Sequence, residues 1–403
     1  MKAVRLAILG FGQRGMIYAA YAKQHAEEFV VTAITDTDPQ KREIAAREYD
    51  CPVFDSYEKM LSFGVEADII AVATQDGDHP EHAIACMKKG YDVLLEKPIA
   101  NTLEGCSEIE KAAKKYGRKV IICHVLRYTP FYGKIKEIID SGRMGDIVTV
   151  STSENVGYYH QAHSFVRGPW RNSGSSSPMI LAKCCHDMDL LRWLIGEKCR
   201  KVASFGSLRY FCKENAPEGC AEFCSECPLK DCIYNAQKIY KEYRWMVNYF
   251  CNETGEEAML KALKGSQYDR CVFHSDNDVV DHQVSIFKFD KEITASHTMT
   301  AFSRTIYRGI KVHATKAELV GIMEDNFLEL RVLGGGTEVI PIDTADANGN
   351  HGGGDIGLMH ELYLERNGMP VKNITYLDVS IDSHKMAFAA EEARVTEKTV
   401  DVL

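Results

Sequence analysis

The sequence predicts an α/β protein with two domains, the first built on a parallel sheet and the second on mostly antiparallel strands. Three observations lead to this prediction. The chain has 403 residues, more than one domain usually holds. Short apolar strands alternate with helical stretches over residues 1–127, and a glycine motif follows the first strand. Beyond residue 279 the strands instead follow one another without long helices between them.

The first domain is predicted to span residues 1–127 and to contain five strands. Alternation of strands and helices is typical of a parallel sheet covered by helices on both faces. Gly90 suits a left-handed cap at the end of one of these helices. The strands are expected over residues 4–9, 29–35, 69–73, 93–95 and 120–123, with helices between them, for example over 39–49 and 79–89.

Residues 128–403 form the predicted second domain, in which the period of the pattern changes. A connecting helix over 131–141 and a strand over 147–153 precede a helix around 180–194. Three glycines at 352–354 indicate a loop, and a closing helix is predicted over 381–394. The antiparallel strands are expected over residues 283–289, 293–299, 309–313 and 328–332.

Composition places the chain among ordinary globular proteins and excludes two classes of partner. Hydrophobic residues make up 45% and charged residues 26%. The net charge of -9 argues against nucleic acid, because phosphates are bound by clustered Lys and Arg. No apolar run reaches the roughly 20 residues that span a bilayer, and no signal peptide precedes the first strand. We therefore expect a cytoplasmic protein whose fourteen cysteines are reduced.

A dinucleotide-binding motif lies between the first strand and the helix that follows it, as Gly10-Phe11-Gly12-Gln13-Arg14-Gly15. The glycines permit a tight turn and let the backbone approach a pyrophosphate at a helix N-terminus. Asp36, at the end of the second strand, is placed to accept hydrogen bonds from the adenosine ribose. Its charge would repel a 2′-phosphate, so the motif predicts a Rossmann domain that binds NAD in preference to NADP. Three alternatives stay open: Asp38 in place of Asp36, a 2′-phosphate accommodated by Arg42, and a glycine turn that serves packing alone.

The tripeptide Glu96-Lys97-Pro98 follows the fifth strand, at the sheet edge where ligands of open parallel sheets bind. An amine at this place can donate a hydrogen bond to the oxygen of a reacting alcohol or carbonyl. Pro98 stiffens the turn, and the bond before a proline is the one where a cis peptide costs little. The alternative is an exposed lysine paired with Glu96.

A second group of polar residues, Lys183-Cys184-Cys185-His186-Asp187-Met188-Asp189, opens an apolar helical run. Histidine is the side chain best suited to take a proton near neutral pH. Helical spacing puts Lys183 and Asp189 on the same face as His186, and we expect Asp189 to orient the imidazole. The alternative is a capping aspartate beside a structural histidine.

These motifs, together with His124-Val125-Leu126-Arg127-Tyr128-Thr129-Pro130, resemble the Gfo/Idh/MocA family, which includes glucose–fructose oxidoreductase and inositol dehydrogenase. The resemblance implies a Rossmann domain and an α/β domain with a large open, mostly antiparallel sheet, commonly used to form a homo-dimer or homo-tetramer. It implies NAD(P)-dependent oxidation or reduction of sugars and polyols, with Lys97 and His186 as the catalytic pair. It also places Thr74 and His79 near the cofactor, and we assign Arg42, Glu96, Lys97 and Arg127 to the same site.

The sequence departs from the family pattern just before the catalytic histidine. Many members carry an aspartate four residues earlier, where this chain has Ala182 followed by Lys183. A second cation would lower the pKa of Lys97 by like-charge repulsion and would suit an anionic or highly hydroxylated substrate. We therefore count Lys183 with the catalytic residues. Asp189 is counted with them because we expect it to orient the imidazole of His186.

Candidate substrate-binding residues lie in a stretch rich in aromatic and basic side chains before residue 172. Aromatic faces and forked arginine donors suit a sugar ring or a carboxylate. The alternative is an interdomain loop packed on its own side chains. With the residues of the catalytic motifs, the predicted substrate site comprises Lys97, Tyr159, Arg167, Trp170, His186 and Asp187.

Four cysteines lie within a short segment with the spacing Cys220-x3-Cys224-x2-Cys227-x4-Cys232. Four thiolates can form a tetrahedral structural zinc site, and the inner pair has the spacing of a zinc knuckle. An uncoordinated cysteine-rich loop and an iron–sulfur cluster or redox pair are the alternatives.

The function predicted from these features is an NAD-dependent oxidoreductase. It would transfer a hydride between nicotinamide and a hydroxyl of a sugar, polyol or sugar acid, with Lys97 and His186 handling the proton. One alternative is a redox-neutral glycosidase that acts through transient oxidation and elimination. Another is a non-catalytic NAD or sugar sensor, which retention of both Lys97 and His186 disfavours.

Overall fold

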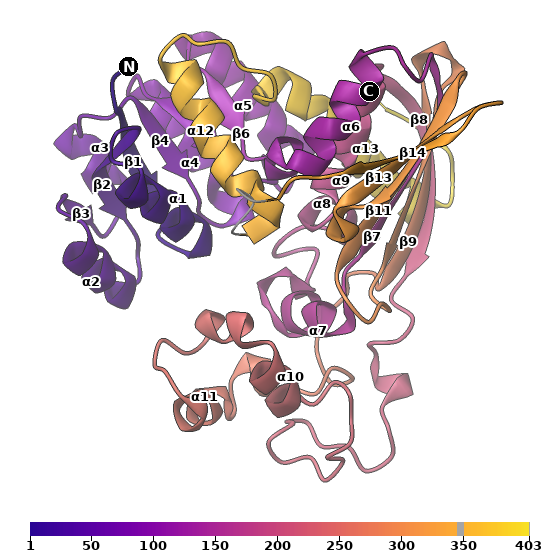
Figure 1. Cartoon of the computed structure of the whole chain (residues 1–403). Helices are drawn as coiled ribbons and strands as arrows, with labels where there is room; N and C mark the ends of the chain where they lie inside the picture. The colour runs from indigo at the N-terminus through magenta and orange to yellow at the C-terminus, as the bar shows by residue number, and fades with distance from the viewer. Residues whose placement is uncertain (345–349, 403) are drawn as a thin grey trace.

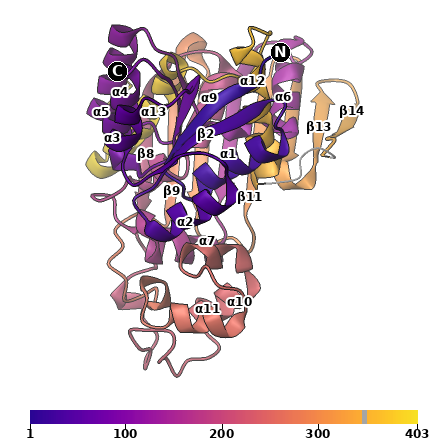
Figure 2. The same ribbon diagram turned by 90° about the vertical axis from the view of Figure 1, so that its left-hand side faces the viewer.

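The computed structural model describes residues 1–344 and 350–402. Two sheets lie side by side with a group of helices between them, and a third, smaller unit projects beyond one end of both (Figures 1 and 2). We refer to this unit, residues 208–281, as the cysteine lobe. No helix of the described residues is long and apolar enough to cross a membrane.

The first sheet has six parallel strands in the order β3-β2-β1-β4-β5-β6, which confirms the predicted Rossmann domain. Strand β1 is buried along nearly its whole length because helices cover both faces. The sequence missed β3, which has only two residues. The strands are β1 Val4–Leu9, β2 Phe29–Thr35, β3 Val53–Phe54, β4 Ile69–Val72, β5 Asp92–Leu95 and β6 Val120–Ile122; the helices are α1 Gln13–Gln24, α2 Pro39–Glu48, α3 Tyr57–Phe63, α4 His79–Lys88 and α5 Leu103–Tyr116.

The second sheet has nine strands in the order β14-β13-β12-β11-β7-β10-β9-β8-β15, and within the described residues only β10 and β7 pair in parallel. Burial alternates along β9, as expected for a sheet with one face on the core. The sheet is therefore mostly antiparallel, as predicted. Its strands are β7 Ile147–Asn155, β8 Cys199–Ser207, β9 His282–Phe289, β10 Thr294–Thr300, β11 Tyr307–Ala314, β12 Ala317–Ile322, β13 Phe327–Val332, β14 Thr337–Pro341 and β15 Val400–Asp401.

The helices of the second domain differ from the prediction in two places. The helix expected around 180–194 is divided into α8 (Met179–Ala182) and α9 (Cys185–Ile195), with Lys183 and Cys184 between them. The glycines expected to form a loop lead directly into a helix that the sequence analysis missed, α12 (Gly354–Arg366). Helix α6 (Pro130–Asp140) matches the predicted connecting helix.

Helix α12 returns to the first domain, although residues 128–403 were predicted to form the second. Its apolar side chains, among them Leu358 and Leu362, are buried in the same core cluster as Leu6 and Ile8 of β1. The closing helix α13 (Leu377–Thr396) begins in the first domain and continues along the second sheet. The C-terminal segment therefore joins the two domains.

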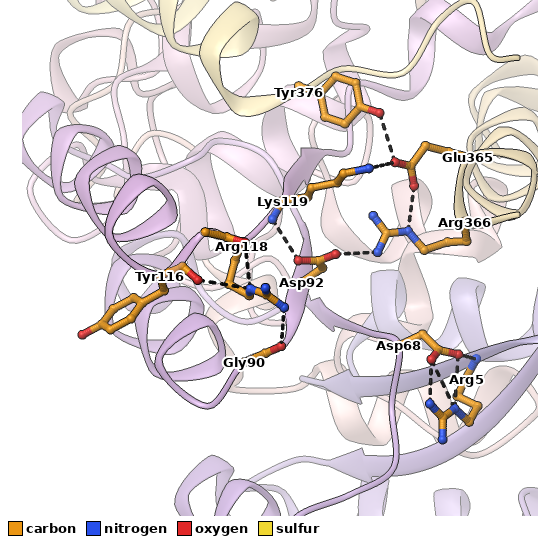
Figure 3. A network of polar contacts seen from close by, with 11 residues as sticks. Arg5, Asp68, Gly90, Asp92, Tyr116, Arg118, Lys119, Glu365, Arg366 and Tyr376 are labelled. Carbon is orange, nitrogen blue, oxygen red and sulfur yellow. Dashed lines mark hydrogen bonds and ion pairs between the residues drawn. The ribbon is translucent and has the colours of Figure 1, made fainter. Parts of the chain in front are cut away.

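A polar network fastens the end of α12 to the first sheet (Figure 3). Arg366 Nη1 lies 2.6 Å from Asp92 Oδ2, and Lys119 Nζ lies 2.6 Å from Glu365 Oε1. The Tyr376 hydroxyl donates to the same Glu365 oxygen at 3.1 Å. The network joins α12 to β5 and to the residue before β6, and so fixes α12 across that side of the Rossmann sheet.

Candidate active site

The glycine loop has the shape that a dinucleotide pyrophosphate requires. A Cβ on Gly10 would lie 2.5 Å from the Ala73 carbonyl oxygen, and one on Gly15 would lie 2.0 Å from that of Gly10. A Cβ on Gly12 would meet nothing within 4 Å, so space is open over the start of α1. Gly12 caps α1 without a side-chain hydrogen bond, which leaves backbone N–H groups of the first turn for an anion. These residues fit NAD at this loop.

Asp36 is held at the end of β2 by two backbone donors, Phe11 N at 2.7 Å and Asp38 N at 2.8 Å. The alternative, Asp38, caps α2 by accepting from Gln40 N at 2.9 Å. Arg42 donates to the Asp36 carbonyl oxygen at 3.0 Å, so its guanidinium is held by backbone. The geometry therefore favours Asp36 over Asp38 as the ribose ligand. The Arg42 guanidinium is partly occupied by its hydrogen bond to the backbone. The Phe11 side chain lies in the core, and Gln13 is exposed.

Arg14 and Glu96, both predicted to bind the cofactor, have side chains that are bound to each other. Arg14 Nε lies 2.5 Å from Glu96 Oε1, and its Nη2 lies 2.6 Å from Asp355 Oδ1. Tyr18 also donates to Glu96. Burial acts to raise the pKa of Glu96, but Arg14 and Lys97 outweigh it and hold this pKa below its ordinary value. The carboxylate is therefore ionised and forms a support beneath the Lys97 turn.

Lys97 lies on a turn that is fixed from several sides. The Lys97–Pro98 bond is cis, and His79 Nδ1 lies 2.8 Å from the Pro98 carbonyl oxygen. His79 is fully buried and holds the turn through this bond, while its predicted place beside the cofactor stays a prediction. Thr74, also predicted near the cofactor, bonds through Oγ1 to His82 Nδ1 at 2.9 Å. Lys97 Nζ reaches the Ala182 carbonyl oxygen at 3.5 Å, next to the segment that carries His186.

His186 lies in the first turn of α9 and is buried beside two other histidines. Its ring centroid is 5.7 Å from that of His124 and 6.0 Å from that of His351. Burial lowers the pKa of His186 well below its usual range, and the charge of Lys97 lowers it further. Its Nδ1 atom is buried and has no hydrogen-bond partner among the described residues. The structure thus brings Lys97 close to His186, and the imidazole of His186 is neutral.

Asp189 does not have the orienting role that helical spacing suggested. Its carboxylate receives Arg127 Nε and Nη2, each at 2.6 Å, and both side chains are almost fully buried. The Arg127 guanidinium also lies 5.3 Å from the Trp193 ring centroid. The carboxylate of Asp189 is therefore paired with Arg127 and not with His186, and the two residues form a structural link between the domains; cofactor binding by Arg127 stays a prediction.

Lys183 is paired with a buried carboxylate that the sequence analysis missed. Its Nζ lies 3.5 Å from Glu154 Oε1, and Arg308 contacts the other Glu154 oxygen. Arg308 Nε also lies 3.4 Å from Asp187 Oδ1. Burial lowers the pKa of Lys183 and raises that of Asp187. Two cations face two carboxylates, so the extra positive charge predicted from Lys183 is compensated. In the sequence, Glu154 could have been found only from its place in β7, where the alternation of the strand turns its side chain inward.

Three predicted substrate residues are held by contacts within the protein. Tyr159 stacks on Tyr243 with ring centroids 3.6 Å apart, in the core of the cysteine lobe. Arg167 is fully buried and donates to the carbonyl oxygens of Arg270 and Tyr234. Trp170 packs against the core of the second domain. The three side chains are held by other parts of the chain, and a substrate role for them stays a prediction.

His351 is the further site residue that the sequence analysis missed. It lies in the turn before α12, beside His186, and its Nδ1 is 3.0 Å from Asp355 Oδ2. The only signal was the glycine-rich segment around it, which indicated a loop and no more.

Comparison with known proteins shows which family models and relatives the chain matches. Residues 4–124 match the family model described as "Oxidoreductase family, NAD-binding Rossmann fold", and residues 136–345 match its "C-terminal alpha/beta domain". The chain is 25% identical to the putative oxidoreductase YteT of Bacillus subtilis (strain 168), over 86% of this chain and 84% of the relative. It is 29% identical to inositol 2-dehydrogenase 2 of Saccharopolyspora erythraea, over 48% of this chain but only 55% of that enzyme.

Solved structures share the fold over the whole chain. A levoglucosan dehydrogenase in complex with NADH and L-sorbose superposes with a TM-score of 0.74 at 18% identity, covering 100% of both chains. Apo scyllo-inositol dehydrogenase from Lactobacillus casei gives 0.68 at 16% identity, covering 100% of this chain and 98% of that one.

Proposed function

The chain belongs to the Gfo/Idh/MocA oxidoreductase family, and on this premise we propose that it is an NAD-dependent dehydrogenase acting on a hydroxyl group of a sugar, polyol or sugar acid. The observation that carries the proposal is the meeting of Lys97 with a buried, neutral His186 at the carboxyl edge of the parallel sheet. NAD, when bound, supplies the acceptor for the hydride.

The two residues divide the handling of the proton. His186 is neutral at physiological pH because its pKa is depressed, so it can accept a proton from a substrate hydroxyl. Lys97 can donate a hydrogen bond to the same oxygen as negative charge develops there. The ionised Glu96 and the bond from His79 fix the turn, and therefore the amine, in place.

The charges around the site favour a neutral substrate with several hydroxyls. Glu154 and Asp187 offset Lys183 and Arg308, so among the described residues around His186 only Lys97 is left as an uncompensated cation for an acid. His186 Nδ1 and Asp187 Oδ2 are buried without hydrogen-bond partners among the described residues, and hydroxyl groups would satisfy both. The relatives named for inositol and levoglucosan agree with this class.

The test is incubation of the protein with NAD+ and a panel of polyols, aldoses, sugar acids and glycosides, following both NADH and free sugar. On the active substrate, Lys97→Ala and His186→Ala should each lower kcat by about 100-fold or more, because each removes a proton-handling group. The NAD dissociation constant should change less than about 3-fold. Lys114→Ala, at an exposed lysine, is the matched control and should keep full activity.

Other outcomes would contradict the proposal. Release of free sugar without NADH would identify a redox-neutral glycosidase. Tight NAD binding with neither NADH nor free sugar formed would identify a sensor. An equal loss of NAD binding and activity in Lys97→Ala would show that Lys97 binds the cofactor and is not a proton-handling group.

A further inference from the structure

The cysteine lobe contains a long segment that regular structure does not hold together. It has two helices, α10 (Ala236–Glu242) and α11 (Glu256–Leu263), and a few short turns, while residues 216–235 have neither helix nor strand beyond one isolated bridge. A segment of this length inside a compact unit normally needs another constraint. Seven of the fourteen cysteines lie in the lobe, and none of them forms a disulfide.

Five of these cysteines line one small cavity. Cys271, from a segment that the sequence analysis did not connect with the motif, joins the four that it predicted. The cavity measures about 20 Å³, room for one water-sized occupant and too small for an iron–sulfur core of many atoms. The cysteines that line it are Cys220, Cys224, Cys227, Cys232 and Cys271.

The two segments run side by side at this cavity. Cys224 N donates to the Asp269 carbonyl oxygen at 2.7 Å, and Cys271 N donates to that of Glu222 at 2.8 Å. These bonds place the sulfur of Cys271 opposite the cysteine motif. They also place His274, one turn further, beside Cys220.

Three side chains already have the spacing of metal ligands. The sulfurs of Cys220 and Cys271 and a ring nitrogen of His274 all lie within 4.8 Å of one another. Cys220 Sγ is 3.3 Å from His274 Nε2. In a tetrahedral zinc site, bonds of about 2.3 Å to sulfur and 2.0 Å to nitrogen put neighbouring ligand atoms roughly 3.5–3.8 Å apart.

A buried arginine supplies a second, independent observation. Arg167 Nη2 points to Cys224 Sγ at 3.5 Å, and its Nη1 is buried with no hydrogen-bond partner. No carboxylate pairs with this guanidinium among the described residues, and an isolated buried cation is costly. A divalent ion with three thiolates and one neutral histidine carries a charge of −1, which Arg167 would balance.

We propose that the cysteine lobe binds one zinc-class divalent ion through Cys220, Cys224, Cys271 and His274. The ion joins residues 216–235 to residues 270–274 and so adds a constraint to the hydrophobic core of the lobe. Cys227 and Cys232, which the sequence analysis assigned as ligands, line the wall of the cavity. The lobe in turn reaches the nucleotide-binding domain, where Asn252 Nδ2 donates to Gln40 Oε1 at 3.0 Å.

The first test is metal analysis of the whole chain, purified without chelator. We expect about one zinc per chain in the wild type and less than about 0.2 in Cys271→Ser and in His274→Ala. Cys212→Ser is the matched control, because Cys212 lies in the same lobe but not at the cavity. It should keep the full equivalent.

A second measurement does not depend on variants that could fail to fold. Wild-type protein produced with cobalt should show the intense visible bands of tetrahedral, thiolate-bound cobalt, and chelation should speed proteolysis of the lobe about 10-fold or more. Less than half an equivalent of zinc together with no cobalt bands would overturn the proposal. So would full zinc in Cys271→Ser, iron with acid-labile sulfide, or a disulfide between cavity cysteines.

Discussion

Breaking the buried pair of Arg127 and Asp189 at one partner should destabilise the protein more than replacing both. The two side chains are 4% and 1% exposed, and two bonds of 2.6 Å join them. Removing one partner leaves the other charge buried and uncompensated, at a cost of about 3–5 kcal/mol. Replacing a buried pair by apolar residues of similar size is often neutral. We expect Arg127→Met and Asp189→Leu each to cost about 3–5 kcal/mol and the double variant clearly less.

The assay is urea unfolding followed by tryptophan fluorescence, which reports directly on this site because Arg127 lies over Trp193. The matched control is the exposed pair of Arg5 and Asp68, which also has paired hydrogen bonds (Figure 3). Their side chains are 44% and 38% exposed, so Arg5→Met and Asp68→Leu should each cost about 1 kcal/mol or less.

Additivity would refute the reasoning. If the Arg127→Met and Asp189→Leu costs summed in the double variant to within about 0.5 kcal/mol, the pair would not be coupled. If Asp189→Asn instead lowered kcat while the unfolding midpoint stayed unchanged, Asp189 would act on His186 after all, as helical spacing first suggested.

Two further predictions concern pH and cofactor choice. Burial acts to raise the pKa of Asp355, but Arg14 and His351 lower it to about 2, from 3.8. Its stabilisation, about 2.4 kcal/mol, should be present above pH 4 and be lost as the pH falls towards 2. Thermal midpoints of wild type and Asp355→Asn should therefore differ by a constant amount above about pH 4.5 and converge as the pH falls from about 4 to 2; a difference that stays constant down to pH 2 would contradict this. Asp36→Ser should raise the NADP-to-NAD ratio of kcat/KM about 10-fold or more, whereas Asp38→Ser, at the α2 cap, should leave it unchanged; equal shifts would reject Asp36 as the ribose ligand.

The sequence predicted well what local patterns determine. β1 and β2 have the predicted bounds because each is an apolar run that ends at a polar or glycine residue. The glycine loop could be predicted because its glycines lie at fixed spacing within six residues of one segment. Helix α12 was missed because two glycines precede it and a third is its first residue, so the sequence resembles a loop.

The errors at the site come from partners far apart in the sequence. Asp189 lies three residues from His186 on the same helix, yet its partner is 62 residues away. The sequence analysis treated Lys183 as an unpaired cation because its partner Glu154 lies far away in the sequence, on strand β7. Helical spacing identifies which side chains share a face of one helix. It does not identify which buried charged residue of another element pairs with them.

The turn that carries Lys97 is held by the C-terminal segment of the chain as well as by the first domain. Ile99 N, just beyond Lys97 and Pro98, donates to His384 Nε2 of α13 at 2.9 Å. Arg14, beneath the same turn, is held by Asp355 of α12. The position of the Lys97 amine relative to His186 therefore depends on two helices that follow both residues in the chain. An amine fixed from both domains keeps its geometry without waiting for the substrate, because the turn, α9 and the C-terminal helices form one packed unit.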